Sequence, residues 1–288
     1  MKKLVWIGIC LAMIGCTKEE PVIIEDKNKE EEIIVEEVEE VDDLSELNQM
    51  ISDYMQTNAL DASMVSYAIQ DLQTGKITGS SNMDENFIAG SVYKLPLCML
   101  WYDRIDQGIV SASQPLYYSE SCNEPGGQIE KDFQIGSYIP LSTVLAYTLI
   151  YSDNAGGHIL FESIGGWTEY KKQAANYSSH PQNEEFFSLS NYLNAQYMCD
   201  VMKRIYDNQE LYKDVIEYLR IASPDDYLNH TIQVDMVQKV GWCENFVNSC
   251  GLSLNGHPYS LCVFTAYNNY GLTVMGDINQ ICYNYFNQ

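Results

Sequence analysis

The sequence has few basic residues. Sixteen Lys and Arg stand against forty Asp and Glu in 288 residues, which gives a formal net charge of −24. Nucleic-acid binders need clustered Lys and Arg to meet the phosphate backbone, so this class is excluded as a partner. The same deficit argues against electrostatic docking on anionic lipid. A run of eighteen apolar residues is also missing, which argues against an ordinary transmembrane helix.

Metal-binding patterns are missing as well. The chain has four histidines, none in an H-x-H or H-E-x-x-H pattern, and it has no C-x-x-C. A metal hydrolase is therefore not expected. Seven of the nine cysteines lie beyond residue 16, an odd number that leaves at least one thiol unpaired within the chain. We expect most of these seven to be buried free thiols, and a bridge between Cys243 and Cys250 is the alternative.

The first residues read as an export signal. Two lysines precede eleven apolar residues, and the stretch ends Met-Ile-Gly-Cys at Cys16. This length suits the apolar region of a signal peptide and is too short to span a bilayer. The ending resembles a bacterial lipobox, which implies lipidation of Cys16 and cleavage before it. A plain secretory signal with an incidental cysteine is the alternative, and either reading places the mature protein outside the cytoplasm.

An acidic segment follows. Residues 17–43 hold thirteen acids and three bases, with one proline and no aromatic residue. Such a composition repels itself and buries too little apolar surface to order, so we expect a tether, with a short amphipathic helix as the alternative. The predicted organisation is a lipoprotein signal peptide at 1–15, a lipidated cysteine and acidic tether at 16–43, and one domain at 44–288. The predicted location is the outer face of the cytoplasmic membrane, in the cell envelope.

Hydrophobic periodicity within 44–288 predicts helix, strands, helices, strands and helix in that order. Apolar residues at helical spacing predict helices, and alternating or β-branched runs bounded by turn residues predict strands. The predicted helices span 44–58, 92–109, 141–164, 191–206, 210–219 and 271–286. The predicted strands span 64–70, 77–80, 234–242, 251–254 and 258–265, with an Asn-Gly turn at 255–256. This order favours an α+β fold in which the first and last strands share one antiparallel sheet, with a helical subdomain inserted between them.

Three short motifs carry the chemistry. They are Ser91-Val-Tyr-Lys94 at a helix start, Ser152-Asp-Asn154, and Lys239-Val-Gly241 on the third strand. Ser91 and Lys94 are three residues apart and share one helical face. A serine hydroxyl needs a neighbouring base, and a lysine serves as one only when burial, a helix N-terminus or a second ammonium lowers its pKa.

The other motif residues complete a set for acyl transfer. Lys239 can supply the second ammonium, and Ser152 can pass a proton to a leaving nitrogen. Asn154 can position a substrate amide and contact Lys94. The backbone N–H groups of Ser91 and Trp242 are candidate oxyanion donors. Asp153 is expected to be structural and His158 to serve packing, while Tyr93 and Tyr151 are candidates to line the site.

With these motifs in place, the sequence resembles the class A β-lactamase and penicillin-binding serine hydrolase family, whose signature is S-x-x-K, S-D-N and K-T-G. The resemblance covers 44–288 and implies the β-lactamase/transpeptidase-like fold. It implies that Ser91 is the nucleophile, Lys94 the base and Ser152 the proton shuttle. It further implies that Asn154, Lys239, Gly241 and Trp242 bind substrate. No cofactor and no metal are implied.

Two departures from the family pattern bear on activity. Val240 replaces the hydroxyl residue that the family uses with its lysine to hold a substrate carboxylate. The stretch at 176–190 is shorter than the family's omega loop and lacks the E-x-x-x-N that activates the deacylating water. Glu184 and Glu185 are its only acids. An acyl-enzyme is therefore expected to form more readily than it hydrolyses.

The sequence thus predicts an exported serine hydrolase that is acylated on Ser91. The expected substrate is a β-lactam or a D-Ala-D-Ala-like cell-wall peptide. One alternative is a D,D-peptidase-like cell-wall enzyme. A second alternative, of another kind, is a penicillin-binding sensor or scaffold that is acylated without turnover.

Overall fold

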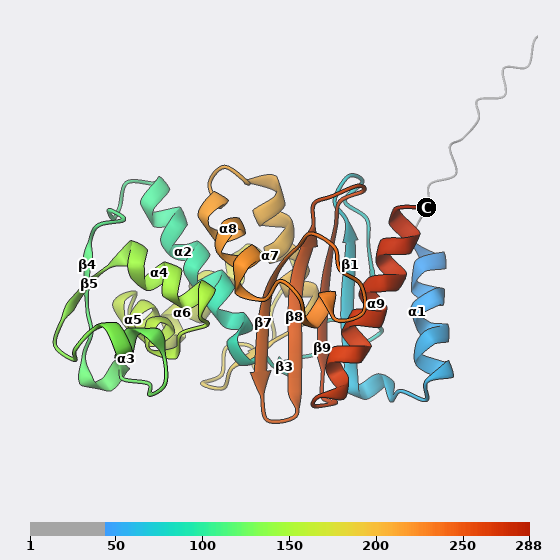
Figure 1. The fold of residues 1–288 in the computed structure, drawn as a ribbon, viewed down its shortest axis with the longest axis horizontal. Coiled ribbons are helices and arrows are strands. Elements are labelled where there is room, and N and C mark those ends of the chain that lie inside the picture. Colours follow the sequence, from blue (N-terminus) through green and yellow to red (C-terminus); the bar gives the residue numbers. More distant parts are fainter. Residues whose placement is uncertain (1–43) are drawn as a thin grey trace, which may run out of the picture. The chain divides into compact units, whose positions relative to one another are not determined.

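A computed structural model describes residues 44–288; the signal, Cys16 and tether predictions lie outside this range. The described chain is built on one five-stranded antiparallel sheet, ordered β2-β1-β9-β8-β7 (Figure 1). The first strand, β1, pairs along its whole length with the last, β9, so the prediction that the two ends of the domain share a sheet is confirmed. The strands are β1 (Val65–Asp71), β2 (Ile77–Gly79), β7 (Met236–Cys243), β8 (Phe246–Ser253) and β9 (Tyr259–Thr265).

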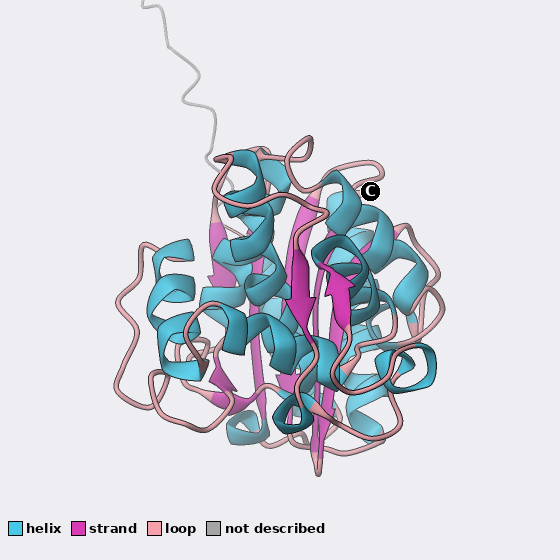
Figure 2. Ribbon diagram, turned by 90° about the vertical axis from the view of Figure 1, so that its left-hand side faces the viewer, coloured by secondary structure: helices cyan, strands magenta, loops and turns pink. Residues whose placement is uncertain are grey.

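Helices cover both faces of this sheet (Figures 1 and 2). One face carries the two terminal helices, α1 (Ser45–Thr57) and α9 (Tyr270–Phe286). The other carries α7 (Ala195–Asp207), α8 (Lys213–Ala222) and a helical lobe. The lobe contains α2 (Lys94–Asp106), α3 (Gln128–Asp132), α4 (Leu141–Ile150), α5 (Asn154–Ser163) and α6 (Trp167–Ala174). The α+β prediction with an inserted helical subdomain is confirmed.

Two small two-stranded pairs complete the lobe and its junction with the sheet. They join β3 (Phe87–Ile88) to β6 (Tyr192–Leu193) and β4 (Pro115–Tyr117) to β5 (Tyr138–Pro140). The β3–β6 pair ties the segment before Ser91 to the segment after the 176–190 loop. These short strands lack the length from which alternation can be recognised in a sequence.

Alternation along the strands divides the apolar core between the two faces of the sheet. In β1, Val65, Tyr67 and Ile69 pack with α1 and α9, whereas Ala68 points to the opposite face, which carries α7, α8 and the lobe. Both faces of this sheet are covered, so every residue of β1 and of β9 is buried. Ala68 shares its face with a row of paired residues across four strands, Lys239–Cys250–Cys262–Ala68. The Lys239 side chain therefore faces the lobe.

Several predicted elements differ from the structure. The helix predicted to begin at 191 begins at Ala195, because residues 192–193 form strand β6. The apolar run at 141–164 is two helices, because the chain breaks at Ser152, whose φ is 53°. Strand β8 begins at Phe246 rather than 251, and five residues, not two, connect it to β9. The polar residues Asn248 and Ser249 hid the start of this strand, because they are buried and hydrogen-bonded inside the sheet.

The seven cysteines from Cys98 to Cys282 are free thiols, so Cys243 and Cys250 do not form a bridge. Six of the seven are buried, and only Cys243 is partly exposed. Between residues 44 and 288, the longest apolar helices fall short of what a bilayer crossing requires.

One lysine is buried in the lobe without a carboxylate partner. Lys171 has no exposed surface, and its Nζ donates to the Tyr192 carbonyl at 2.6 Å and lies 4.0 Å from the centre of the Phe186 ring. Burial lowers its pKa from 10.5 to about 7. Folding therefore favours the neutral amine, and a protonated Lys171 costs free energy on burial.

We expect the pH dependence of the unfolding free energy to reveal the lowered pKa of Lys171. In the unfolded chain Lys171 stays protonated until pH approaches 10, whereas in the folded chain it loses its proton near pH 7. The unfolding free energy of the wild type should thus rise, relative to a Lys171→Met variant, as pH goes from 7 to 10. Denaturant unfolding at pH 7.0 and 9.5 measures this. The exposed Lys213→Met variant is the control, and an equal shift in both variants would contradict the assignment.

Candidate active site

The Ser91–Lys94 pair lies at the start of α2. Ser91 belongs to a single 3₁₀ turn, Gly90–Tyr93, and Lys94 is the first residue of the helix. The Lys94 Nζ is 2.9 Å from the Ser91 Oγ. Lys94 is fully buried, and burial lowers its pKa from 10.5 to about 8. At pH 7 about one molecule in ten would then hold a neutral amine, far more than an exposed lysine would.

The break between α4 and α5 brings two further motif residues to Lys94. Its Nζ donates to the Ser152 carbonyl at 2.6 Å and to the Asn154 Oδ1 at 2.5 Å. A neutral amine has two N–H groups and one lone pair. With both N–H groups taken by these two acceptors, the lone pair points to the Ser91 hydroxyl. This arrangement prepares Lys94 to accept the serine proton.

Lys239 on β7 reaches the same point from the sheet side. Its Nζ donates to the Ser152 Oγ at 3.0 Å and to the Val240 carbonyl at 2.8 Å. Burial and then the charge of Lys94 lower its pKa from 10.5 to about 7. The charge of a protonated Lys94 therefore makes a second proton on Lys239 less favourable.

The edge of the sheet comes very close to the nucleophile turn. A Cβ added to Gly241 would lie 2.3 Å from the Ala89 carbonyl oxygen and 2.8 Å from the Ser91 nitrogen. A Cβ added to Gly90, whose φ is +56°, would lie 2.7 Å from the Trp242 nitrogen. Only glycine fits at either place. The approach sets the Ser91 and Trp242 backbone nitrogens on neighbouring segments beside the Ser91 side chain, as an oxyanion site requires.

Asp153 has a structural place in the motif. Its Oδ1 accepts from the Gly156 N–H at the start of α5, and its Oδ2 accepts from the Gln128 and Ile129 N–H groups. The carboxylate is 2% exposed. It caps one helix and ties α3 to it, which fixes the turn that presents Ser152.

The acids of the 176–190 loop do not join this cluster. Glu184 and Glu185 are both exposed. The acidic groups whose charge acts on Lys94 are instead Asp153 and Glu124. Glu124 lies on the loop before α3, with its Oε1 3.5 Å from the His158 Nδ1. His158 also stacks on Phe161, so its predicted packing role agrees with its contacts.

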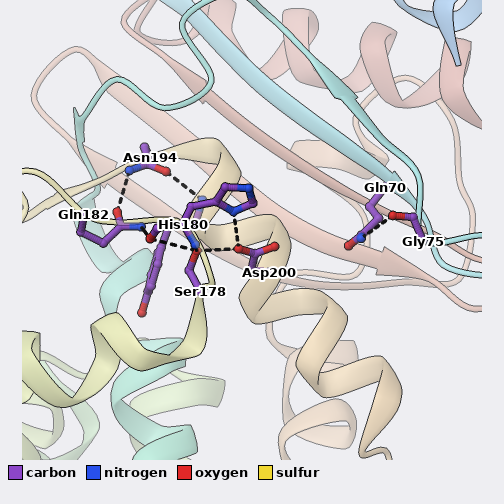
Figure 3. Close-up of polar contacts among 8 residues, drawn as sticks. Gln70, Gly75, Ser178, His180, Gln182, Asn194 and Asp200 are labelled. Atoms are coloured by element: carbon purple, nitrogen blue, oxygen red, sulfur yellow. Dashed lines mark hydrogen bonds and ion pairs between the residues drawn. The ribbon is translucent and has the colours of Figure 1, made fainter. Parts of the chain in front are cut away.

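The loop is held by polar contacts around Asp200 (Figure 3). Asp200 Oδ2 accepts from the Ser178 Oγ at 2.5 Å and lies 3.0 Å from the His180 Nδ1. Gln182 donates to the His180 carbonyl, and Asn194 donates to Gln182. This is not a second catalytic triad. The Ser178 hydroxyl donates its hydrogen bond to Asp200 rather than to a histidine nitrogen, and it accepts one from the His180 backbone N–H. The contacts attach the loop to the start of α7.

The structure thus brings together Ser91, Lys94, Ser152, Asn154 and Lys239, with Gly241 and Trp242 at their edge. Cys16 lies outside the described residues. Tyr93 packs beside the site, with the Lys94 Nζ 5.7 Å from its ring centre, whereas Tyr151 is 57% exposed.

The sequence analysis missed four residues near the site: Glu124, Phe161, Trp167 and Asn191. None belongs to a motif, and Glu124, Trp167 and Asn191 make contacts with residues far from them in the chain. Asn191 is the clearest case, because its Nδ2 donates to the carbonyl of Gly90, one hundred and one residues earlier.

The fold and the serine–lysine arrangement define the class of the chain as β-lactamase and transpeptidase-like. Known structures with this fold superpose over most of it. A β-lactamase from Chitinophaga pinensis matches with a TM-score of 0.71 at 21% identity, covering 84% of this chain and 100% of that one. PBP-A, solved as a mutant acyl-enzyme with penicillin G, matches with a TM-score of 0.72 at 17% identity, covering 84% and 97%.

The chain belongs to the beta-lactamase enzyme family, whose model matches residues 46–286. Beta-lactamase VEB-1 of Pseudomonas aeruginosa is 31% identical over 99 residues, which are 34% of this chain and 33% of that protein. The extended-spectrum beta-lactamase PER-1, from the same organism, is 32% identical over 88 residues, which are 30% and 29%. The alignments therefore span about a third of these curated relatives.

Proposed function

We propose that this protein is a serine hydrolase that is acylated on Ser91 by a β-lactam or a D-Ala-D-Ala-like amide. The observation that carries the proposal is the Lys94 amine, buried and placed 2.9 Å from the Ser91 hydroxyl. Membership of the beta-lactamase enzyme family and the penicillin G acyl-enzyme of PBP-A, a protein of the same fold, support it.

The geometry gives a balanced acylation step. The Ser91 Oγ attacks the amide carbon as its proton passes to the lone pair of Lys94, and the charge on the carbonyl oxygen meets the Ser91 and Trp242 N–H groups. The carbon–nitrogen bond breaks as the Ser152 hydroxyl gives its proton to the leaving nitrogen. Lys239, which donates to the Ser152 Oγ, replaces that proton. The reactive state is the one in which Lys94 is neutral and Lys239 holds the proton, and after the step Lys94 holds it.

Among residues 44–288, neither acid of the 176–190 loop is placed against Lys94 as a base for deacylation. Glu184 and Glu185 are exposed, and the charge that acts on Lys94 comes from other acids. We therefore propose that the acyl-enzyme hydrolyses slowly. This favours a penicillin-binding enzyme or sensor of the D,D-peptidase kind over an efficient β-lactamase.

The deciding experiment follows the adduct on the described domain. Residues 44–288 are incubated with penicillin G, intact mass is recorded over time, and nitrocefin hydrolysis is measured in parallel. We expect a covalent adduct that persists for minutes or longer, with little turnover, and no adduct on Ser91→Ala. Rapid turnover would overturn slow deacylation. No adduct on Ser91 with β-lactams, D-Ala-D-Ala peptides or activated esters would overturn the function itself.

The acylation rate should depend on the protonation of Lys94. Its pKa is lowered to about 8, so acidification protonates the base and leaves the Ser91 proton without an acceptor. The first-order acylation rate at saturating penicillin G should rise about tenfold per pH unit below pH 7, as Lys94 loses its proton, and should fall again at alkaline pH, as Lys239 loses the proton that it supplies to Ser152. Quenched-flow mass spectrometry from pH 5.5 to 9.5 measures it, with Ser91→Ala recording the spontaneous reaction. A flat profile would show that Lys94 is not the base.

We also propose that the protein is exported and anchored by a lipid on Cys16 to the outer face of the cytoplasmic membrane. The support is the sequence of residues 1–16 and the acidic stretch that follows. In cells labelled with a palmitate analogue, the full chain should carry label and sediment with membranes. Cys16→Ser should lose the label. Equal labelling of the two would refute lipidation at this residue.

A further inference from the structure

The segment that follows the 176–190 loop holds the nucleophile turn through two groups of one residue. The backbone carbonyl of Asn191 accepts from the Ala89 N–H at 2.9 Å, and the Asn191 Nδ2 donates to the Gly90 carbonyl at 2.6 Å. The first contact extends the pairing of β3 with β6. The second holds the peptide group that joins Gly90 to Ser91. One residue outside the motifs therefore contacts both residues that precede the nucleophile.

The Gly90–Ser91 peptide carries one of the two candidate oxyanion donors. A peptide group is planar, and in the usual trans form its C=O and N–H point in opposite directions. Because the Gly90 carbonyl is directed at Asn191, the Ser91 N–H is directed away from it. Strand β7 comes close to this nitrogen, since a Cβ added to Gly241 would lie 2.8 Å from it. The hydrogen bond from Asn191 thus sets the direction of the Ser91 N–H relative to β7, which supplies the Trp242 N–H.

The Asn191 amide fits this contact in one orientation. A carboxamide has an NH₂ donor and an oxygen acceptor, and the reversed amide would set its oxygen against the Gly90 carbonyl oxygen. The Asn191 Oδ1 is buried and has no hydrogen-bond partner among residues 44–288. An unpaired buried oxygen costs free energy, which offsets what the contact with Gly90 contributes to folding. The side chain therefore matters more to the geometry of the turn than to the stability of the fold.

Asn191 is held in place by the protein itself. Its own carbonyl is paired with Ala89, and the carbonyl of Tyr192, the next residue, accepts from the Lys171 Nζ at 2.6 Å. Lys171 is fully buried, so water does not compete for this contact. The amide that holds the nucleophile turn is thus in position before a substrate binds, and no reorganisation is needed during the reaction.

We propose that Asn191 is a positioning residue for the oxyanion site, because it holds the Gly90–Ser91 peptide in the orientation in which the Ser91 N–H meets the carbonyl oxygen of the acyl donor. This deepens the proposed function and rests on it. When Ser91 attacks, negative charge develops on that oxygen, and a donor already in place stabilises the charge more than it stabilises the neutral carbonyl. A hydrogen bond accepted by the Gly90 carbonyl also polarises the peptide and strengthens its N–H as a donor.

The test removes the Asn191 donor in two variants. Asn191→Leu keeps the approximate volume of the side chain and Asn191→Ala does not, and neither can donate to the Gly90 carbonyl. We expect the first-order acylation rate at saturating penicillin G to fall about tenfold in both, because the Ser91 N–H remains but is no longer held. The penicillin G concentration at half-saturation should change little, since the contact acts on the transition state. Quenched-flow mass spectrometry measures both quantities.

The carbonyl stretch of the acyl-enzyme ester reports the oxyanion site directly. Penicillin G labelled with ¹³C at the β-lactam carbonyl gives this band in infrared difference spectra. Hydrogen bonds to the ester oxygen lower the stretching frequency, so the band of both Asn191 variants should lie at a higher wavenumber than that of the wild type. An unchanged band would overturn the proposal, whether or not the rate falls, because a merely structural role would slow acylation without moving the band.

Asn229→Ala is the matched control. Asn229 is a buried asparagine whose Nδ2 also donates to backbone carbonyls, those of Pro224 at 2.7 Å and Val234 at 2.9 Å. Its replacement should lower the melting temperature at least as much as Asn191→Ala does, and it should leave the acylation rate and the ester band at their wild-type values. If Asn229→Ala moves the band as far as Asn191→Ala, the effect comes from lost stability and the proposal fails.

NMR of the free protein separates this proposal from the proposed function. With ¹³C at glycine carbonyls and ¹⁵N on serine, each Gly–Ser peptide gives one correlation, and the correlation that Ser91→Ala removes belongs to Gly90–Ser91. Loss of its hydrogen bond should move the Gly90 carbonyl resonance upfield in Asn191→Leu but not in Asn229→Ala. If the wild type forms no adduct, the proposed function fails, and this shift then decides whether Asn191 orients the Ser91 N–H. An unmoved resonance would overturn that role.

Discussion

The site depends on one contact, the 2.9 Å approach of a buried lysine amine to a serine hydroxyl. A lysine in water is protonated and cannot take a proton, so this contact is useful only if the surroundings exclude water and supply acceptors for the remaining N–H groups. The lobe provides the acceptors through the turn at Ser152 and Asn154. The sheet provides the cover, because Gly90 and Gly241 allow β7 to lie against the nucleophile turn. The Ser91–Lys94 contact therefore depends on both the helical lobe and the sheet.

The sequence predicted the fold well where long-range pairing left a local signal. The shared sheet, the terminal helices and the inserted lobe all follow from periodicity. The break at Ser152 could not be seen, because the apolar spacing of 141–164 continues through it. A positive φ at a residue other than glycine also leaves no recognisable pattern in the sequence. The motif residues were found because the chemistry needs them at fixed spacing. The contacts of Trp167 with Tyr93 and of Asn191 with Gly90 were not found, because they form only when segments far apart in the chain pack together.

Contacts with α7 set the course of the 176–190 segment. In this chain the 176–190 segment is anchored through Asp200 and Asn194 to α7, and its acids face solvent. The proposed slow deacylation rests on this exposure of the two acids. The same course leaves Leu189 83% exposed and places the Ser188 carbonyl where it accepts the Trp167 indole N–H.

The three buried lysines show that burial alone does not make a base. Burial lowers the pKa of Lys94, Lys171 and Lys239, and all three are neutral more often than an exposed lysine. Within residues 44–288, the contacts of Lys171 are with a backbone carbonyl and an aromatic ring rather than with a hydroxyl that it could deprotonate. Lys239 donates to the hydroxyl of Ser152 and is suited to supply a proton there. Only at Lys94 do two acceptors occupy the N–H groups while a serine oxygen stands at the third position, and this difference in partners separates the proposed base from the other two amines.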